Sequence, residues 1–423
     1  MRPLRNLTFS GLALVVLIAL SGQAFSSSTV AVGTCTKLVN YPTIQQAVTA
    51  VSANGTVKVC PGTYPEQVTI TKNLTLIGIG PTASTVVVPA GGLLTNGVTD
   101  IYGNQVAAQI FVQGANAVTI SHIAVDGAND QVFTCAIDPI GIYFQNSAGT
   151  ITDDAVRNVL MPPGYQGCQG GLAINVESDV GSPVVNITNN SVRNYDKNGI
   201  TVSGPGTGGP NATVSGNTVV GLGPTPVIAQ NGIQIGYGAG ATVQNNYVVD
   251  DIYTGGYYGS SGILIYLSDG TGVAGNTVES TQYGIVPVAN RTLITGNHVG
   301  GTQTYDAIDD CGEGGQVTSN VIYGSSQDAI HLDDTCGAGS GSNIVVEKNT
   351  INEACAGILQ GPLATGDKIP LSGASANTFL NVNYTVLGDS DSCTPTLAPD
   401  ANAKTSATSA KRLRPSPYKP NRD

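Results

Sequence analysis

Two short patterns recur together from about residue 186 onward, and their spacing limits the folds that this chain can adopt. One is a small residue followed by isoleucine, which gives Ile200, Ile233, Ile263, Ile285, Ile308, Ile330 and Ile358. The other is V/I-x-x-N-x-V/I, which gives Asn190, Asn217, Asn246, Asn276, Asn297, Asn320 and Asn349. Successive members lie 21 to 33 residues apart. Repeats of this length indicate a solenoid or an array.

Each repeat has the pattern of β-strands. Segments such as SGILIYL and VAGNTVES alternate apolar with polar residues and are separated by Gly, Asn, Ser or Asp, without a helical period. The repeats are also too short to hold a crossover helix. Strands stacked about 4.8 Å apart would bury the isoleucines in a row and place each asparagine over the next. The repeated positions are therefore predicted to be structural.

The segment YPTIQQAVTAVSANGTVKVCPGTYPEQVTITKNLTLIGIG carries a family resemblance. From about Cys35 to Cys393, the chain resembles the right-handed parallel β-helix proteins of the pectin lyase-like superfamily, which include pectate lyases, polygalacturonases and pectin esterases. The resemblance implies an all-β fold, a single-stranded right-handed parallel β-helix of about 10–13 coils. It also implies a short N-terminal capping helix, with Thr43 as N-cap and Asn54-Gly55 at its end. The apolar face of this helix would consist of Ile44, Ala47, Val48 and Val51.

The two ends of the chain differ from the repeat region. Residues 1–24 carry Arg2 and Arg5, the apolar run GLALVVLIAL and a small-x-small end, which predicts a secretory signal peptide cleaved after Ala24. The apolar run is short for an uncleaved anchor, so no membrane span is expected after cleavage. Residues 25–395 are predicted to form the β-helix domain, and residues 396–423 a disordered basic tail. The protein is therefore expected to be secreted or to reside in the cell envelope, extracellular or periplasmic.

Eight cysteines in an exported chain predict four disulfides. A separation of one coil brings two cysteines within reach of each other. Proximity of this kind predicts the pairs Cys35–Cys60, Cys135–Cys168, Cys311–Cys336 and Cys355–Cys393. Eight cysteines allow 105 connectivities, so other pairings stay open.

The charge of the chain limits its partners. The formal net charge is −11, and no Lys or Arg occurs between Lys72 and Arg157. Such an acidic protein is not expected to bind nucleic acid, or to hold a polyanion by charge alone. It is compatible with a neutral polysaccharide, or with an anionic one bridged by Ca²⁺. Three scattered histidines and two methionines do not predict a copper site.

The repeat points to a candidate site, because it predicts which side chains face outward. If Ile308 and Ile330 point into the core, alternation directs Asp309 and His331 outward on adjacent coils, roughly 5 Å apart. The same two coils carry the densest group of acidic residues in the chain, namely Asp306, Asp310, Glu313, Asp328, Asp333 and Asp334.

Three interpretations of this group are open. Carboxylates held close together raise one another's pKa and can supply the acid and base of glycoside hydrolysis, here from Asp309, Asp310, His331 and Asp333. Alternatively, the oxygens bind Ca²⁺, with Asp309, Glu313 and Asp334 as ligands. No other cofactor is required. In the third interpretation, the aspartates bond their own backbone at turns.

The motifs of the superfamily are present only in part. Polygalacturonases carry N-T-D, D-D, G-H-G and R-I-K on successive coils. Here T-Y-D at Asp306 and Q-D at Asp328 match in part, or Asp309-Asp310 matches D-D with His331 one coil later, while G-H-G and R-I-K are missing. The G-x-Y-x-E motif of pectin esterases occurs as GTYPE and is expected to be structural, because the other esterase motifs are missing.

Basic and aromatic residues complete the predicted site. Lyases of the superfamily abstract a proton with Arg or Lys beside Ca²⁺, and Arg291 is placed to act in this way. Tyr257, Tyr258 and Tyr266 lie within two coils and suit sugar faces, although packing is their alternative use. We therefore predict a monomer that binds a polysaccharide, pectin-like or other, and cleaves it as a hydrolase or lyase on an acidic outer face. The alternative is a noncatalytic carbohydrate-binding or adhesion protein, because β-helices host both.

Overall fold

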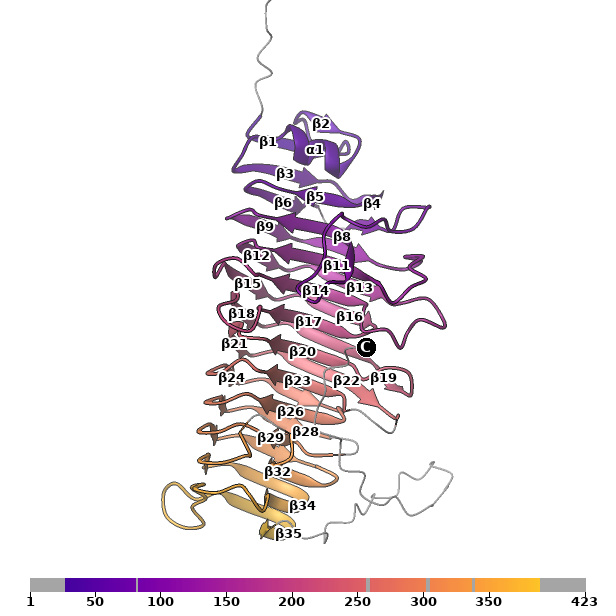
Figure 1. Cartoon of the computed structure of the whole chain (residues 1–423). Helices are drawn as coiled ribbons and strands as arrows, with labels where there is room; N and C mark the ends of the chain where they lie inside the picture. The colour runs from indigo at the N-terminus through magenta and orange to yellow at the C-terminus, as the bar shows by residue number, and fades with distance from the viewer. Residues whose placement is uncertain (1–26, 81–82, 256–258, 302–304, 337–338, 389–423) are drawn as a thin grey trace, which may run out of the picture.

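The structure, a computed structural model, describes residues 27–80, 83–255, 259–301, 305–336 and 339–388. These residues form a right-handed parallel β-helix, as predicted, in which successive coils stack along one axis (Figure 1). The predicted signal peptide (1–24) and basic tail (396–423) lie outside the described residues.

The strands of the coils form three parallel rows, which we call A, B and C. Row A is a 13-stranded sheet made of β2 (Asn40–Tyr41), β1 (Thr29–Val32), β3 (Gly55–Val59), β6 (Leu74–Gly78), β9 (Val118–Ser121), β12 (Gly149–Thr152), β15 (Val184–Thr188), β18 (Asn211–Ser215), β21 (Gly240–Gln244), β24 (Gly272–Ala274), β27 (Leu293–Thr295), β30 (Gln316–Thr318) and β33 (Val345–Glu347).

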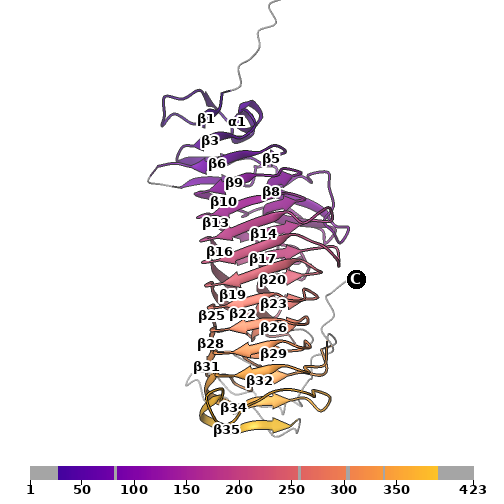
Figure 2. The ribbon, with the colours of Figure 1, turned by 90° about the vertical axis from the view of Figure 1, so that its left-hand side faces the viewer.

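Rows B and C run side by side in Figure 2 and share the long strand β34 (Thr350–Gln360), which pairs with β35 (Thr378–Gly388). Row B further contains β4 (Gly62–Pro65), β7 (Ser84–Val87), β10 (Ile123–Asp126), β13 (Ala155–Val159), β16 (Ser191–Tyr195), β19 (Thr218–Thr225), β22 (Tyr247–Tyr253), β25 (Thr277–Glu279), β28 (His298–Gly300) and β31 (Val321–Tyr323). Row C further contains β5 (Val68–Ile70), β8 (Gln105–Gln113), β11 (Ile137–Gln145), β14 (Leu172–Glu177), β17 (Asn198–Ser203), β20 (Asn231–Gly236), β23 (Ser261–Tyr266), β26 (Tyr283–Val288), β29 (Ile308–Asp310) and β32 (Asp328–Leu332).

The repeated isoleucines form one buried column in row C. Each isoleucine is the register partner of the next, from Ile200 to Ile358. All seven are fully buried, as predicted. Each such side chain contributes about 1.5–3 kcal/mol relative to exposure. Residues that follow or precede them by one position therefore face outward.

The repeated asparagines form a hydrogen-bonded ladder at the corner between rows A and B. Each side-chain amide donates to Oδ1 of the asparagine in the next coil, 2.9 or 3.0 Å away, from Asn190 through to Asn377. The same Nδ2 donates to a backbone carbonyl of the preceding coil. The ladder thus satisfies polar groups that would be costly to bury alone.

Asp154 occupies the ladder position that precedes Asn190. Its Oδ1 accepts a hydrogen bond from the backbone N–H of Ile123 (2.7 Å), and its own N–H donates to Oδ1 of Asn190 (3.0 Å). Its Oδ2 is buried without a hydrogen-bond partner among the described residues. Burial raises the pKa of Asp154 well above its ordinary value, because the ionised carboxylate loses its hydration there. An ionised carboxylate also cannot donate a hydrogen bond as the asparagine amide does.

The N-terminal end of the solenoid is closed by helix α1 (Ile44–Ala50). Its N-cap Thr43 accepts a hydrogen bond from the backbone N–H of Gln46 (3.1 Å). Glu66, the last residue of GTYPE, accepts the N–H groups of Ile44 and Gln45 at 2.8 and 2.9 Å. The G-x-Y-x-E motif therefore holds the start of the capping helix.

Among the described residues, three disulfides join neighbouring segments of the solenoid, namely Cys35–Cys60, Cys135–Cys168 and Cys311–Cys336. They are three of the pairs that spacing predicts. Cys393, the predicted partner of Cys355, lies outside the described residues. In the part of the chain that the structure describes, no helix is both long and apolar enough to cross a membrane.

The effect of the buried Asp154 carboxylate on stability can be tested by substitution. Substitution Asp154→Asn should place an amide where the carboxylate lacks a partner, and so raise the free energy of unfolding at pH 7 by about 1 kcal/mol in urea denaturation. Because the folded-state pKa of Asp154 is raised, the gain should shrink as the pH falls and the wild-type carboxyl regains its proton.

The reverse change, Asn246→Asp, serves as the matched control. It removes the donor to Val214 O and Asn276 Oδ1, so it should cost roughly 2 kcal/mol or more at pH 7. Equal effects of the two substitutions would contradict this account of the ladder.

Candidate functional site

Row C brings the two central residues of the predicted site together. Strands β29 and β32 pair with Ile308 opposite Ile330 and Asp309 opposite His331. Both isoleucines are buried in the core. Asp309 and His331 therefore project from the outer face of row C on adjacent coils.

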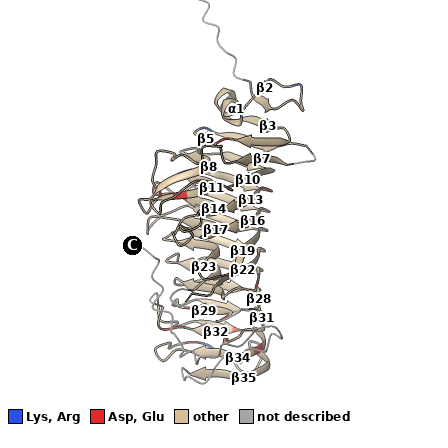
Figure 3. Ribbon diagram, turned by 90° about the vertical axis from the view of Figure 1, so that its right-hand side faces the viewer, with Lys and Arg blue, Asp and Glu red and all other residues tan. Residues whose placement is uncertain are grey.

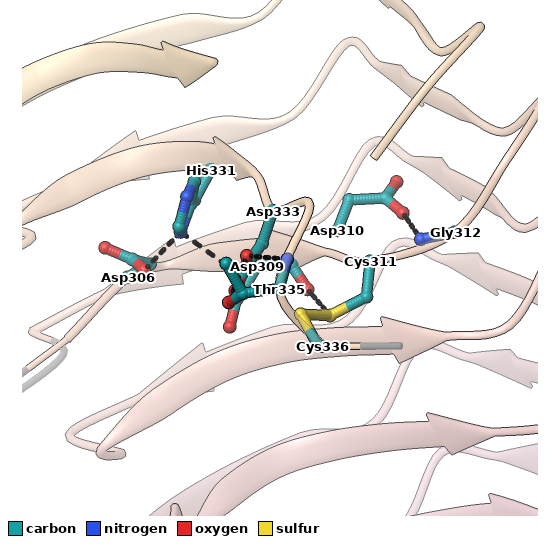
Figure 4. The surroundings of a disulfide bond; sticks show 9 residues. All are labelled: Asp306, Asp309, Asp310, Cys311, Gly312, His331, Asp333, Thr335 and Cys336. Carbon is teal, nitrogen blue, oxygen red and sulfur yellow. Dashed lines mark hydrogen bonds and ion pairs between the residues drawn. A yellow bond between two sulfur atoms is a disulfide. The ribbon is translucent and has the colours of Figure 1, made fainter. Parts of the chain in front are cut away.

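His331 lies between two carboxylates (Figure 4). Its Nδ1 is 3.2 Å from Oδ2 of Asp306 and 3.4 Å from Oδ1 of Asp309. Asp306 is held from the next coil, because its Oδ1 accepts the backbone N–H of Asp328 (3.1 Å). The two acids and the imidazole thus form one contact group that spans two coils.

Asp333 completes this group, and we call Asp306, Asp309, His331 and Asp333 the acid cluster. One oxygen of Asp333 lies within 4.8 Å of one oxygen of Asp309. Its Oδ1 accepts hydrogen bonds from the N–H and the hydroxyl of Thr335, at 2.6 and 2.7 Å. The Cys311–Cys336 disulfide joins the segments that follow β29 and β32, so it fixes the two coils beside the cluster.

The cluster separates the pKa values of its members. Burial, and then the negative charge of Asp333, raises the pKa of Asp309 well above its ordinary value. Burial alone would lower the pKa of His331, but the hydrogen bond and charge of Asp306 and the charges of Asp309 and Asp333 raise it to about 10. The cluster therefore combines an imidazolium at neutral pH with a carboxyl group, that of Asp309, whose protonated form is favoured. Such separated values suit acid–base chemistry.

Tyrosines pack beside the acid cluster, and the sequence analysis did not single them out. The rings of Tyr283 and Tyr305 stack with centroids 4.8 Å apart. Burial, and then the charge of Asp309, raises the pKa of Tyr283 well above its ordinary value. Tyr283 also packs with Leu264 and Cys311 in an apolar layer on the outer face. Its register position opposite Ser261 in row C is the signal that could have located it.

Asp310, also predicted as catalytic, lies in different surroundings. Because side chains alternate along β29, Asp310 points to the face opposite that of Asp309. Figure 4 shows its carboxyl turned toward Gly312, whose N–H donates to Oδ1 at 2.9 Å. Burial raises the pKa of Asp310 to about 7, the Gly312 hydrogen bond opposes this, and the charge of Asp367 adds to it. The structure therefore does not place Asp310 in the acid cluster.

The structure does not bring the three predicted calcium ligands together. Glu313 is exposed and accepts a hydrogen bond from Asn343 Nδ2 (3.3 Å). Asp334 Oδ2 accepts the backbone N–H of Leu363 (2.7 Å). Within the described ranges, neither residue shares with Asp309 a group of three close metal-ligating side chains.

The predicted substrate-binding residues are scattered. Arg291 lies in the exposed turn between β26 and β27 and forms a salt bridge with Asp269 (2.9 Å). Tyr266 projects from row C, with its ring edge-on to that of Tyr237 at 5.2 Å. The remaining two, Tyr257 and Tyr258, lie outside the described residues.

A second group of buried acids lies on row C nearer the N-terminus, and the sequence analysis missed it. Figure 3 shows acidic residues in red beside β11 as well as near β32. Glu177 accepts hydrogen bonds from the Tyr143 hydroxyl (2.8 Å) and Asn175 Nδ2 (3.0 Å). Burial, opposed by these bonds and reinforced by the charge of Asp100, raises the pKa of Glu177 to about 7. Burial and Asp100 also raise the pKa of Asp138 well above its ordinary value.

A loop between β7 and β8 crosses this second group. The N–H of Ile101 donates to Glu177 Oε2 (3.2 Å), and the hydroxyl of Tyr102 donates to Ser203 Oγ (3.3 Å). The ring of Tyr102 also meets that of Tyr237 edge-on at 5.2 Å. The loop therefore spans several coils of row C and is hydrogen-bonded to Glu177, one of the acids that it covers.

Comparison with known proteins assigns the chain to a family. A family profile described as "Periplasmic copper-binding protein (NosD)" matches residues 95–307, which is 213 of the 423 residues. The chain belongs to the NosD family. The NosD match ends before Asp309, His331 and Asp333. A search of curated proteins found no match.

Solved structures with low sequence identity share the fold of this NosD-family chain. The Dettilon tailspike protein is 14% identical, with a TM-score of 0.53 over 78% of this chain and 62% of its own. The A-module of the Azotobacter vinelandii mannuronan C-5 epimerase AlgE4 is 14% identical, with a TM-score of 0.50 over 82% and 90%. PfbA, a surface adhesin of Streptococcus pneumoniae, is 14% identical, with a TM-score of 0.54 over 85% and 92%. The chain spans less than two thirds of the tailspike.

The described residues of this NosD-family chain do not fit a copper site. Copper favours imidazole, thiolate and thioether ligands. None of the described cysteines is free, and Met161 is buried in an apolar layer. The described residues include two close groups of potential ligands. One has a single imidazole between two carboxylates, and the other counts the disulfide-bonded Cys311 and Cys336.

The charge state of His331 can be tested by NMR titration. We expect the His331 imidazole to titrate near pH 10 and to stabilise the fold below about pH 6.5, an effect that is lost as the pH rises through about 10. Asp306→Asn removes the hydrogen bond and the charge, so the pKa should fall well below 10. The exposed His298 provides the internal control. A wild-type His331 that titrates near 6.5 would contradict the ion-paired cluster.

The second acid group predicts a loss of stability with rising pH. Because the folded-state pKa of Glu177 is raised to about 7, the native state holds a proton that the unfolded state releases near pH 4.5, so stability falls between these values. Glu177→Gln should remove the Glu177 contribution to this fall and stabilise the protein at pH 8 by roughly 3 kcal/mol at most, measured by urea denaturation at pH 4 and 8. The exposed control Glu313→Gln should not change the pH dependence. An unchanged pH dependence in Glu177→Gln would refute the assignment.

Proposed function

We propose that the protein binds a polysaccharide along the outer face of row C and cleaves it by acid–base chemistry at the acid cluster. The observation that carries this proposal is the position of His331 Nδ1, 3.2 Å from Asp306 and 3.4 Å from Asp309 on that face. On the same face nearer the N-terminus, Gln234 is half-buried and offers an amide to a sugar, whereas Tyr143, Asn175 and Thr201 of its register column are buried.

Asp309 is the proposed general acid. Its raised pKa favours the protonated form, which can donate to a glycosidic oxygen. Once it has lost the proton, its negative charge lies 3.4 Å from Nδ1 of the His331 imidazolium, which stabilises it. His331 and Asp306 thus support the acid without direct proton transfer to the substrate.

Asp333 is the proposed partner of Asp309. Thr335 fixes one of its oxygens through two hydrogen bonds. The nearest oxygens of Asp333 and Asp309 lie within 4.8 Å of each other. This proximity suits a retaining enzyme, whose carboxyl groups are about 5–5.5 Å apart, better than an inverting one, which places them about 6.5–9.5 Å apart to admit water. Hydrolysis with a nucleophilic Asp333 and retained anomeric configuration is therefore the reaction that we propose.

A neutral polysaccharide is the proposed substrate class. The carboxylates of the cluster would repel uronate groups held close to them. The His331 imidazolium supplies the positive charge that Ca²⁺ would otherwise provide, so we propose that cleavage requires no metal. Tyr266 and Tyr237 are proposed to contact sugar rings farther along the same face.

Polysaccharide binding without cleavage is the second candidate function. The neighbours that share this fold include a mannuronan C-5 epimerase and a surface adhesin, so the same solenoid supports both catalysis and adhesion. The incomplete polygalacturonase motifs favour the adhesion alternative.

An exported, monomeric protein is the proposed form. The three disulfides suit an oxidising compartment, and the NosD family is described as periplasmic. We therefore propose a location in the periplasm or at the cell surface.

The proposal can be tested with purified protein and a panel of neutral and acidic polysaccharides, with Ca²⁺ or with EDTA. Reducing ends report hydrolysis, and absorbance of unsaturated products reports elimination. We expect hydrolysis of a neutral glycan that is insensitive to EDTA. Asp309→Asn should reduce the rate by at least about 10³-fold, and His331→Ala by about 10²-fold or more, with little change in binding.

Asp179→Asn is the matched control, because it removes the same charge from an exposed corner after β14. It should leave the rate unchanged. Hydrolysis that survives Asp309→Asn in a folded protein would remove the acid cluster as the active site, and binding without any cleavage would favour the adhesion alternative.

A further inference from the structure

The outer face of row B carries an exposed group of aromatic and polar side chains that the proposed chemistry does not use. It consists of Tyr247, Glu279, His298 and Tyr323, which we call the row B platform. Tyr247, Thr277, His298 and Val321 follow one another in register, and so do Glu279, Gly300 and Tyr323 in the neighbouring column. The platform therefore extends over four successive coils.

Glu279 ties the two tyrosines together. Its Oε2 accepts a hydrogen bond from the Tyr247 hydroxyl (3.2 Å), and its Oε1 accepts one from the Tyr323 hydroxyl (2.8 Å). Tyr247 belongs to the coil before Glu279, whereas Tyr323 lies two coils after it. One carboxylate thus fixes the orientation of two rings that approach it from opposite directions.

Gly300 permits this arrangement. A Cβ atom at position 300 would lie 2.2 to 2.6 Å from ring atoms of Tyr323. The Tyr323 ring therefore lies against the backbone of β28 and reaches past this coil to Glu279. His298 flanks the same ring edge-on, with centroids 4.9 Å apart. The result is a ring held close to the sheet by backbone and neighbours.

Solvent reaches the side chains of the platform, and its hydroxyl donor Tyr323 stays protonated. Tyr247 and His298 are exposed, and Glu279 and Tyr323 are half-buried. The hydrogen bond to Glu279, together with burial, raises the pKa of Tyr323 to about 12, so its hydroxyl keeps its proton at any physiological pH. The carboxylate, the hydroxyls and the imidazole remain within reach of a ligand in solution.

The chemistry of these groups matches a neutral sugar. Fixed aromatic rings with polar edges offer a stacking surface, and a carboxylate accepts hydrogen bonds from hydroxyl groups. The two register columns from 247 to 323 contain no Lys or Arg, and Glu279 is acidic. These columns would therefore repel a polyanion, because they carry the negative charge of Glu279 and no positive charge. Strands about 4.8 Å apart also allow one chain to contact several coils.

We propose that the row B platform is a second glycan-binding surface, specific for neutral pyranose chains and separate from the acid cluster on row C. It retains a chain by stacking on Tyr323 and Tyr247 and by hydrogen bonds to Glu279 and His298. It carries out no chemistry. The inference does not depend on cleavage at row C, because the two surfaces share no residue.

Calorimetric titration of the full chain can test the platform. The probes are neutral xylo-, cello- and manno-oligosaccharides of six units, with oligogalacturonate of the same length as the charged comparison. We expect at least one neutral probe to bind and the charged one not to. Tyr323→Ala and Tyr247→Ala should each weaken binding at least tenfold. Tyr323→Phe keeps the ring and should weaken it less, which guards against loss of folding in the alanine variant.

Two controls separate this proposal from the proposed active site. Tyr384→Ala removes a comparably exposed tyrosine from β35 and should not change affinity. Asp309→Asn should leave binding at the platform intact, even where it abolishes cleavage. The proposal fails if no neutral probe binds the wild type, or if folded Tyr323→Ala binds as tightly as the wild type. It also fails if oligogalacturonate binds best. Loss of cleavage alone leaves it intact.

Discussion

Parallel hydrogen bonding between successive coils is the constraint on which the rest of this structure depends. Backbone hydrogen bonds align every strand of the solenoid with the strand of the preceding coil. The asparagine ladder, from Asn190 to Asn377, aligns the same coils through side-chain hydrogen bonds. A slip by one residue would turn the isoleucine column outward and break the ladder at the same time. Two independent sets of contacts therefore enforce one register.

Because the register is fixed, residues at equivalent strand positions form columns that run along the solenoid. The chemical properties of the surface depend on how the side chains change along a column. On row C, one column carries the aromatic side chains Phe111 and Tyr143. It continues with amide and hydroxyl groups at Asn175 and Thr201, and with an aliphatic side chain at Leu264. It becomes charged only at Asp309 and His331. The core beneath stays apolar throughout, so outward chemistry can vary without loss of the fold. Row B shows the same freedom, where Gly300 allows the Tyr323 ring to reach Glu279.

The part of the site that lies on paired strands could be predicted from the sequence. Asp309 and His331 follow isoleucines of the repeat, so alternation places both on one face and pairing makes them neighbours. Residues in turns could not be placed in this way. Glu313 and Asp334 are close in sequence to Asp309 and His331, yet the turns carry them toward Asn343 and Leu363. Asp310 is adjacent to Asp309 and, because side chains alternate along a strand, points elsewhere. The group around Glu177 was missed because Ile101, in a loop outside the repeat, lies 76 residues away in the chain.

By itself, the sequence determined the fold, the buried columns, the asparagine ladder and the pairing of Asp309 with His331, because a repeat with strand alternation admits one register. Only the tertiary structure decided the direction of each turn, the position of the loop over Glu177 and the burial of individual carboxyl groups. Those features depend on contacts between segments whose spacing in the sequence does not follow the repeat. Burial then sets the pKa values, which rise at Asp309 and Glu177 because a desolvated carboxylate is costly to ionise. Thus the repeat placed Asp309 beside His331, and the packing around the acids determined which of them have raised pKa values.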